Sequence, residues 1–199
     1  MRIVSAREVE SWLANGEVLE KDARGPKVVA LQEGVYLKIF HTRKNPLLAR
    51  LQPAARRFAC NAAGLQRRGI PTPDVVDVFW MDKRRGLSAC IYRPLAGVSI
   101  QQIYLSEPCN VEGILPGLAA FIRSLHKAGI YFRSLHLGNV ILLPDEQYGL
   151  IDFLDLQFKT RPLNTWLIER NFQHLRRYLE RHNLQNFPFD KLRKLYDLS

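Results

Sequence analysis

One Asn and one Asp constrain the fold of this chain more than any other pair, because of their separation and their neighbours. Asn139 precedes the apolar run 140–143, and thirteen residues after it Asp152 lies in a second apolar run, 150–153. A turn at 144–146 separates the runs, which therefore predict two short buried strands. Carboxamide and carboxylate oxygens suit a hard divalent cation. We expect Asn139 and Asp152 to bind one metal ion; the alternative is a helix cap and a strand-end acid.

The composition is that of a globular protein. Of 199 residues, 47% are hydrophobic and 24% are charged, which allows one domain or two small lobes. No apolar run is long enough to cross a bilayer, and the first residues lack the apolar region of a signal peptide. Cys60, Cys90 and Cys109 are widely spaced without metal-ligand pairing, which favours a reduced, cytoplasmic protein.

The positive charge is unusual in its distribution. The formal net charge is +10, from 29 Lys and Arg against 19 acids, and no acid lies between Glu33 and Asp74. The cations of this segment are Lys38, Arg43, Lys44, Arg50, Arg56, Arg57, Arg67 and Arg68. Such a surface attracts the phosphates of nucleotides, lipids or nucleic acid, although a solvated basic face without a ligand is the alternative.

The order of predicted elements indicates a two-lobed α+β protein. Strands are expected at 26–31, 35–40, 75–81, 87–92, 140–143 and 150–153, and helices at 54–68, 111–127 and 166–182. A hairpin turn is expected at Glu33-Gly34, and residues 93–97 form a connector between the lobes.

Taken in this order, the residues resemble the protein-kinase-like superfamily, and more closely the lipopolysaccharide core sugar kinases (heptose and Kdo kinases) with their small toluene-tolerance-protein relatives. The segments that carry the resemblance are 22–28, 36–40, 69–73, 92–95, 125–129, 131–139 and 151–155. The resemblance implies a small β-rich N-lobe at residues 1–95 and a mostly helical C-lobe at 96–199. His126, at the end of a predicted helix, is interpreted as a packing residue.

The resemblance also implies that ATP and Mg²⁺ are cofactors. Arg24 and Gly25 take the place of the loop that covers the phosphates, although an ordinary tight turn explains a single Gly equally well. Lys38 takes the strand position whose ammonium meets the nucleotide phosphates. Tyr92 and Arg93 belong to the hinge where backbone groups meet the adenine. Asn139 and Asp152 match the two magnesium ligands.

The chain departs from the kinase pattern at the catalytic base. Ser134 stands five residues before Asn139, where the pattern has an Asp, and a serine hydroxyl is no base near neutral pH. His136 and Asp155 are the alternative bases; otherwise His136 is structural and Asp155 an exposed loop acid. The helix Glu that pairs with Lys38 in kinases is also missing. Since a general base contributes roughly 10²–10⁴-fold, its loss alone leaves a slow enzyme possible.

Three functions are therefore compared. The first is an ATP- and magnesium-dependent phosphotransferase acting on a lipopolysaccharide core sugar or another anionic acceptor. The second is a nucleotide-binding pseudokinase that regulates envelope biogenesis. A basic nucleic-acid-binding module ranks last, because no helix-turn-helix, ribonucleoprotein or zinc-finger signature accompanies the charge. The resemblance implies a cytoplasmic location, either free or peripheral on the anionic inner-membrane surface.

Overall fold

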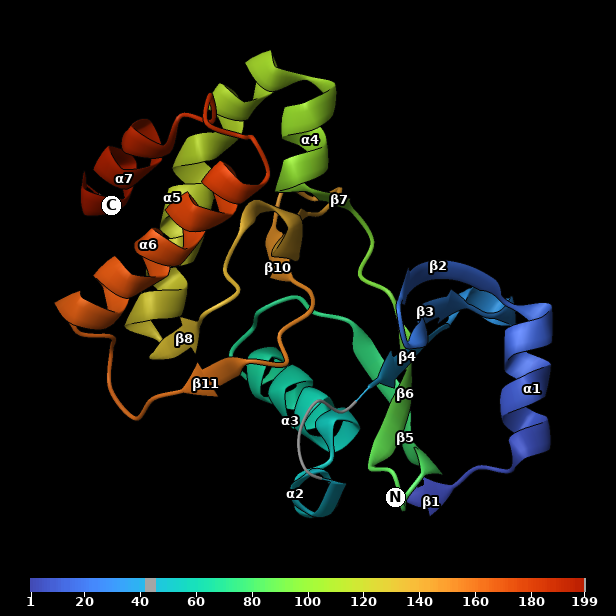
Figure 1. Cartoon of the computed structure of the whole chain (residues 1–199). Coiled ribbons are helices and arrows are strands. Elements are labelled where there is room, and N and C mark those ends of the chain that lie inside the picture. The colour runs from blue at the N-terminus through green and yellow to red at the C-terminus, as the bar shows by residue number, and fades with distance from the viewer. Residues whose placement is uncertain (42–45, 199) are drawn as a thin grey trace. The chain divides into compact units, whose positions relative to one another are not determined.

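The computed structural model describes residues 1–41 and 46–198. The internal contacts divide the chain into two compact units, shown in Figure 1. The first unit comprises Met1–Arg67 and Thr72–Leu95, and the second comprises Arg68–Pro71 and Ala96–Ser199. Relative to the predicted division after residue 95, residues 68–71 group with the second unit. Arg43 and Lys44 of the predicted basic segment lie outside the described residues.

The first unit is built on a six-stranded sheet of order β1-β5-β6-β4-β3-β2. The strands are β1 (Arg2–Ile3), β2 (Glu17–Asp22), β3 (Gly25–Ala30), β4 (Tyr36–Phe40), β5 (Asp74–Asp82) and β6 (Leu87–Arg93). β1 pairs with β5 in parallel, and all other neighbours are antiparallel. The helices are α1 (Ala6–Asn15), α2 (Pro46–Leu51) and α3 (Ala54–Gln66), with a 3₁₀ turn at Gln32–Gly34.

The alternation of side chains along β4 separates the two faces of this sheet. Leu37 and Ile39 belong to the buried cluster against which Trp12 of α1 packs. The ring of Phe40, which points the other way, lies 5.5 Å from the ring of Phe58 on α3. Helix α1 therefore covers the Leu37 face of β4, and α3 covers the face to which Phe40 points.

The second unit is mostly helical. Its helices are α4 (Ile100–Ser106), α5 (Val111–Lys127), α6 (Thr165–Arg181) and α7 (Phe189–Leu198). Its strands are β7 (Val98–Ser99), β8 (Ile130–Phe132), β9 (Val140–Leu142), β10 (Tyr148–Leu150) and β11 (Leu156–Phe158). They form a three-stranded sheet, β10-β9-β7, and a two-stranded ladder, β11-β8. Short strands and connecting loops thus lie among the helices, and these loops carry the candidate site.

Most elements predicted from periodicity are present, and one strand is wrong. Helix α5 has the predicted bounds, and α6 is shifted by one residue at each end. The strand predicted at 150–153 is instead β10, Tyr148–Leu150, because the backbone turns left-handed at Asp152 (φ 55°) and leaves the ladder. Glu33-Gly34 lies in a 3₁₀ turn in which both residues have positive φ. The predictions omitted the helices α1, α2, α4 and α7 and the strands β1, β2, β7, β8 and β11.

The architecture is therefore mixed α and β, with a sheet-rich unit and a helical unit. Within the described part of the chain, no helix combines the length and the apolar character that crossing a bilayer requires.

Candidate functional site

The loop between β8 and β9 carries three of the predicted site residues. Leu135 N donates to Phe132 O over 3.0 Å, and Asn139 N donates to His136 O over 2.9 Å, so two successive tight turns fold the loop onto itself. The second turn is the 3₁₀ helix Leu137–Asn139. These turns direct the side chains of Ser134, His136 and Asn139 into one neighbourhood.

The side chain of Asn139 is held by both of its amide hydrogens. Nδ2 donates to the backbone oxygen of Ser134 over 3.0 Å and lies 3.2 Å from Nε2 of His136. Asn139 is buried, with 8% of its surface exposed. Because the nitrogen is used within the loop, the oxygen Oδ1 is the atom of this side chain that remains to ligate a cation.

Backbone pairing between two segments brings Asp152 close to Asn139. Val140 of β9 pairs with Leu150 of β10, and Ile151 N donates to Asn139 O over 3.0 Å. The residue after Ile151 is Asp152, which is exposed and left-handed. The structure thus brings the two predicted metal ligands onto neighbouring backbone segments. Their binding of one ion stays a prediction.

Asp155 contacts Ser134, the residue that the resemblance aligns with the catalytic Asp of kinases. The hydroxyl of Ser134 donates to Asp155 Oδ2 over 2.7 Å, and Arg133 Nε donates to the same oxygen over 3.3 Å. The other oxygen, Oδ1, is buried and has no hydrogen-bond partner among the described residues. Asp155 is half-buried rather than an exposed loop acid, so that alternative is wrong.

His136 is fixed by an aromatic stack. Its ring lies parallel to Tyr178 of α6 with centroids 3.9 Å apart, and His182 lies beyond Tyr178 at 4.2 Å. Burial lowers the pKa of His136 to about 4, and the charges of Asp152 and Asp155 offset only part of this effect. At neutral pH the imidazole is therefore uncharged, with Nε2 facing the amide of Asn139.

Tyr178 and Gln101 are site residues that the sequence analysis missed. The hydroxyl of Tyr178 donates to Oε1 of Gln101 on α4, and a Cβ atom at Gly138 would lie 2.8 Å from that same oxygen. Gly138 therefore permits a close approach of the loop to both helices. The signal in the sequence was weak, since Tyr178 and His182 are merely four residues apart on one helix.

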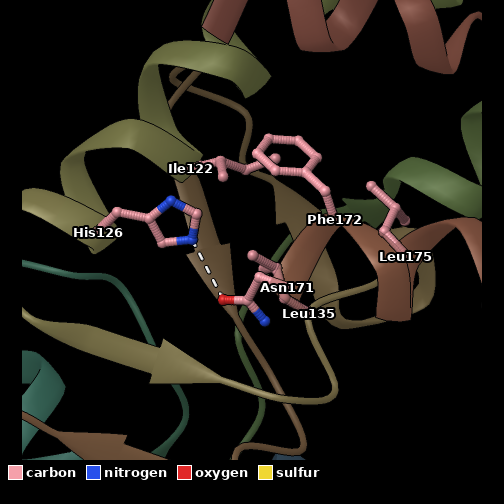
Figure 2. A pocket seen from close by; sticks show the side chains of 6 residues that line it. All are labelled: Ile122, His126, Leu135, Asn171, Phe172 and Leu175. Carbon is pink, nitrogen blue, oxygen red and sulfur yellow. Dashed lines mark hydrogen bonds between the residues drawn. The ribbon is translucent and has the colours of Figure 1, made fainter. Parts of the chain in front are cut away.

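A buried polar network anchors the start of the loop. Asn171 Nδ2 donates to Phe132 O over 2.6 Å, and its Oδ1 lies 3.2 Å from His126 Nε2 (Figure 2). His126 Nδ1 lies 2.9 Å from the hydroxyl of Tyr196, and burial lowers the pKa of His126 to about 4. The interpretation of His126 as a packing residue is confirmed.

The cavity beside His126 is too small to be a ligand site. Its volume is about 10 Å³, which holds one water molecule at most. Its lining is largely apolar: Ile122, His126, Leu135, Asn171, Phe172 and Leu175 (Figure 2).

Lys38 and Tyr92 lie together in the first unit. Lys38, half-buried on β4, places Nζ 5.9 Å from the centroid of Phe58. Tyr92 is buried, with ring centroids 6.2 Å from Phe58 and 5.7 Å from Tyr36. Lys38 therefore points to the α3 face of the sheet, as an inward-facing lysine should. Its contact with a nucleotide stays a prediction.

Arg24, Gly25 and Arg93 lie at strand ends. Arg24 belongs to the tight turn between β2 and β3, where its N donates to Asp22 Oδ1 over 2.8 Å and lowers the pKa of that carboxyl. Gly25 has φ 119°, which favours glycine. The guanidinium of Arg93 is exposed and pairs with Asp74 at 3.2 Å. An ordinary tight turn accounts for the conformation of Arg24 and Gly25. Their contact with the phosphates of a nucleotide stays a prediction.

The donor set fits magnesium better than zinc. Among residues 1–41 and 46–198, no group of three His, Cys, Asp or Glu side chains is arranged to hold a metal. Asn139 and Asp152 supply two oxygen ligands. Mg²⁺ commonly takes one or two protein carboxylates or amides and completes its shell with phosphate oxygens and water.

Comparison of the chain with models of known protein families gives no match, and comparison with curated protein sequences finds no significant relative.

Proposed function

We propose that the chain is a magnesium- and ATP-dependent phosphotransferase of the kinase-like type, with Asp155 as its general base. One observation carries the proposal: the hydroxyl of Ser134 donates to Asp155 over 2.7 Å. Ser134 stands where kinases have the catalytic Asp. The carboxylate of Asp155 thus contacts the residue that stands at that position.

Asp155 suits the role of base better than His136 does. Nε2 of His136 faces an N–H of Asn139, and its low pKa makes the ring a weak proton acceptor. Oδ2 of Asp155 accepts hydrogen bonds from Ser134 and Arg133, while Oδ1 makes no hydrogen bond to the described residues. Because Oδ1 is buried, an acceptor hydroxyl reaches this oxygen only when the groups that cover it move aside.

The chain's own groups divide the remaining work. Asn139 Oδ1 and the carboxylate of Asp152 would hold Mg²⁺, which neutralises charge on the transferred phosphoryl group. His136 orients Asn139 through the contact between Nε2 and Nδ2. Asn171 fixes the backbone just before Arg133. The assignment of Lys38 to the nucleotide phosphates, and of a lipopolysaccharide core sugar as acceptor, rests on the family resemblance alone.

The test is transfer of the labelled γ-phosphoryl group of ATP, with magnesium, to an added phosphorylated sugar or to water, by the full chain and two variants. Asp152→Asn should lower turnover at least about 100-fold, because it removes the charge beside the predicted ion. Asp145→Asn, in an exposed turn, is the control and should leave turnover unchanged. Turnover that is identical in Asp152→Asn and the unaltered chain would contradict the proposal.

The runner-up function is a nucleotide-binding pseudokinase. The contacts of Asp155 support it, since Oδ2 of this carboxylate already accepts from both Ser134 and Arg133. Nucleotide binding without turnover, together with an unchanged inactive state in Arg133→Gln, would favour this alternative. Magnesium-dependent turnover in the unaltered chain that falls at least about 100-fold in Asp152→Asn would favour the enzyme.

A further inference from the structure

Helix α6 carries an exposed line of cations on one side. Trp166, Arg170, His174, Arg177 and Arg181 follow one another at intervals of three or four residues. At about 100° per residue, they span roughly 80° of the helix circumference. The three arginines and Trp166 are exposed, and His174 is half-buried. We call Arg170, Arg177 and Arg181 the α6 cation stripe; His174 lies among them, and burial lowers its pKa.

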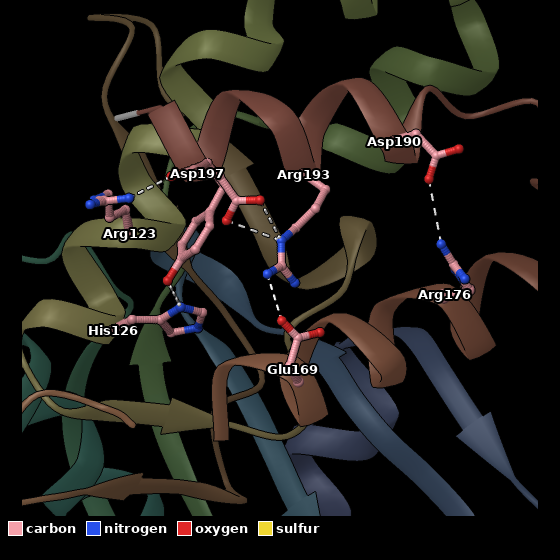
Figure 3. Close-up of polar contacts among 8 residues, drawn as sticks. Arg123, His126, Glu169, Arg176, Asp190, Arg193 and Asp197 are labelled. Atoms are coloured by element: carbon pink, nitrogen blue, oxygen red, sulfur yellow. Dashed lines mark hydrogen bonds and ion pairs between the residues drawn. The ribbon is translucent and has the colours of Figure 1, made fainter. Parts of the chain in front are cut away.

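The acids of α6 do not neutralise this stripe. Glu169 lies on another side of the helix and pairs with Arg193 of α7 (Figure 3). Arg176, although next to Arg177 in sequence, pairs with Asp190 at 3.4 Å. Arg170, Arg177 and Arg181 form no ion pair with any described residue; Arg170 rests over the ring of Trp166 at 5.1 Å. The arginines of the stripe are therefore not ion-paired with Glu169 or, among the described residues, with the other acid of the helix, the exposed Glu180.

The stripe borders the candidate site. Two contacts fix α6 along the loop after β8: Asn171 donates to Phe132 O, and Tyr178 stacks on His136. His174 and Arg181 each follow one of these two contact points by three residues, so they lie on the adjoining side of the helix. The next loop residue after Phe132 is Arg133, which adds a further cation at Asp155.

The charges that shift the pKa of His174 agree with this position of the stripe. The pKa of His174 is lowered by burial first and then by the charges of Arg170, Arg133 and Arg177, whereas Asp155 raises it. These charges therefore converge on one region. Nε2 of His174 is buried there without a hydrogen-bond partner among the described residues.

We propose that the α6 cation stripe, together with Arg133, binds a phosphate group of the acceptor beside Asp155. Guanidinium groups match phosphate oxygens with paired hydrogen bonds, and several of them in line suit a polyanion. Anion binding at the stripe stands by itself, whereas its role as an acceptor subsite rests on the proposed phosphotransfer. The phosphate belongs either to a soluble phosphorylated sugar or to a lipid headgroup.

The experiment uses inorganic pyrophosphate as the probe, without divalent cations, and calorimetry on the full chain. Arg177→Ala should weaken binding about fivefold or more, and Arg177→Ala/Arg181→Ala about twentyfold or more, because charge-assisted hydrogen bonds are lost. Arg176→Ala is the matched control: it removes the same charge from the same helix, outside the stripe, and should change affinity less than about twofold.

Trp166 supplies a second readout. Trp166 is 63% exposed, and binding beside Arg170 should change its fluorescence. Replacing it, in Trp166→Phe, should abolish the change while the calorimetric affinity is kept within about threefold. Equal weakening by Arg176→Ala and Arg177→Ala would overturn the proposal, as would a loss of binding in Lys38→Ala with none in Arg177→Ala.

Two further arms separate the sources of phosphate and the two proposals. If the ligand is a lipid headgroup, the chain should bind phosphatidylglycerol vesicles more tightly than phosphatidylcholine vesicles, and Arg177→Ala should weaken this binding as it weakens pyrophosphate binding. If the ligand is soluble, Arg177→Ala should weaken the binding of pyrophosphate alone. Pyrophosphate binding should persist in Asp152→Asn. Failure of phosphotransfer with intact, Arg177-dependent binding would therefore contradict the proposed function and leave the anion site standing.

Discussion

At the scale of single residues, the pair Ser134 and Asp155 determines what this site can do. The Ser134 hydroxyl donates to Asp155 Oδ2 and orients the carboxylate, whose other oxygen, Oδ1, is buried without a hydrogen-bond partner among the described residues. Replacement of either partner therefore tests a different property: Asp155 supplies the charge, and Ser134 supplies the orientation.

Asp155→Asn should lower turnover roughly 10²–10⁴-fold, because the amide accepts the hydrogen bond of Ser134 but takes no proton. Ser134→Ala should lower it only about tenfold, since the carboxylate is kept and merely loses an orienting hydrogen bond. Steady-state transfer of the labelled γ-phosphoryl group of ATP, with magnesium, to an added phosphorylated sugar or to water measures both. A wild-type rate in Asp155→Asn would exclude this residue as base and return attention to His136.

His126 makes the stability of the second unit depend on pH. Its folded-state pKa is about 4, lowered from 6.5 by burial, so the unfolded chain binds the proton first as the pH falls. Stability is therefore highest above pH 6.5 and declines between pH 6.5 and 4, by about 3 kcal/mol at this site. His136, whose pKa is also about 4, adds a decline of the same sign.

Urea unfolding at a series of pH values from 7 to 4 checks this effect. His126→Gln should be less stable than the unaltered chain at pH 7, because its contacts with Asn171 and Tyr196 are altered. Its loss of stability between pH 7 and 4 should be about half as large, since one of the two buried imidazoles is gone. The same slope in both proteins would contradict the assignment.

At the scale of elements, the joint between α5 and β8 positions the loop that carries the site. Gly129 ends the helix with φ 69°, and its carbonyl accepts from Lys159 N over 2.7 Å, next to the β11–β8 ladder. A Cβ atom there would lie 2.6 Å from Arg161 O and 2.7 Å from Lys159 O. Both the conformation and the space therefore require glycine.

Gly129→Ala should destabilise the second unit by about 2–4 kcal/mol, from left-handed strain plus a backbone clash. Gly69→Ala separates the two causes, because Gly69 has the same φ of 69° with open space around its Cβ position. It should cost only about 1 kcal/mol. Urea midpoints of both variants give the comparison, and equal losses would mean that the clash is relieved by movement.

The elements differ in how far the sequence predicts them. Helix α5 has the predicted bounds, because Leu118, Ile122 and Leu125 recur at helical spacing and Gly129 ends the helix. Helices α1 and α4 were missed, although capping boxes at Ser5–Glu8 and Ser99–Gln102 mark their starts. Their short lengths and, in α1, the lack of any buried residue make periodicity weak.

At the scale of the whole molecule, the chain has two compact units, each with its own core. The first unit holds its cysteines in opposite environments: Cys60 is exposed on α3, and Cys90 is buried in β6, where burial raises the pKa of its thiol to about 12. The two thiols therefore report on the surface and on the core of one unit.

Iodoacetamide at pH 8 should label Cys60 at least about 100 times faster than Cys90, because Cys90 reacts only when the sheet opens. Peptide mass spectrometry after timed quenching measures each thiol separately. Addition of urea near the unfolding midpoint should bring the two rates together. Rapid labelling of Cys90 in the native protein would contradict a closed sheet around β6.

The sequence predicts several residues of the candidate site but not the contacts between them. The spacing of Asn139 and Asp152 indicated their approach, because two paired strands bring such residues together. The contact of Ser134 with Asp155 depends on how the loop after β10 returns to β8, which no local pattern encodes. The place of the cation stripe beside the loop likewise follows from tertiary contacts of α6.

The left-handed backbone at Asp152 restricts which amino acids this position can hold. Glycine adopts such a conformation without strain, and Asn and Asp adopt it at low cost, whereas alanine and bulkier residues are disfavoured by about 1 kcal/mol or more. Of the three tolerated types, two have a side-chain oxygen and one is an anion. The backbone conformation thus limits the substitutions that this position tolerates. Asp152 can be replaced by Asn or Gly with the chain path intact, and by few other residues.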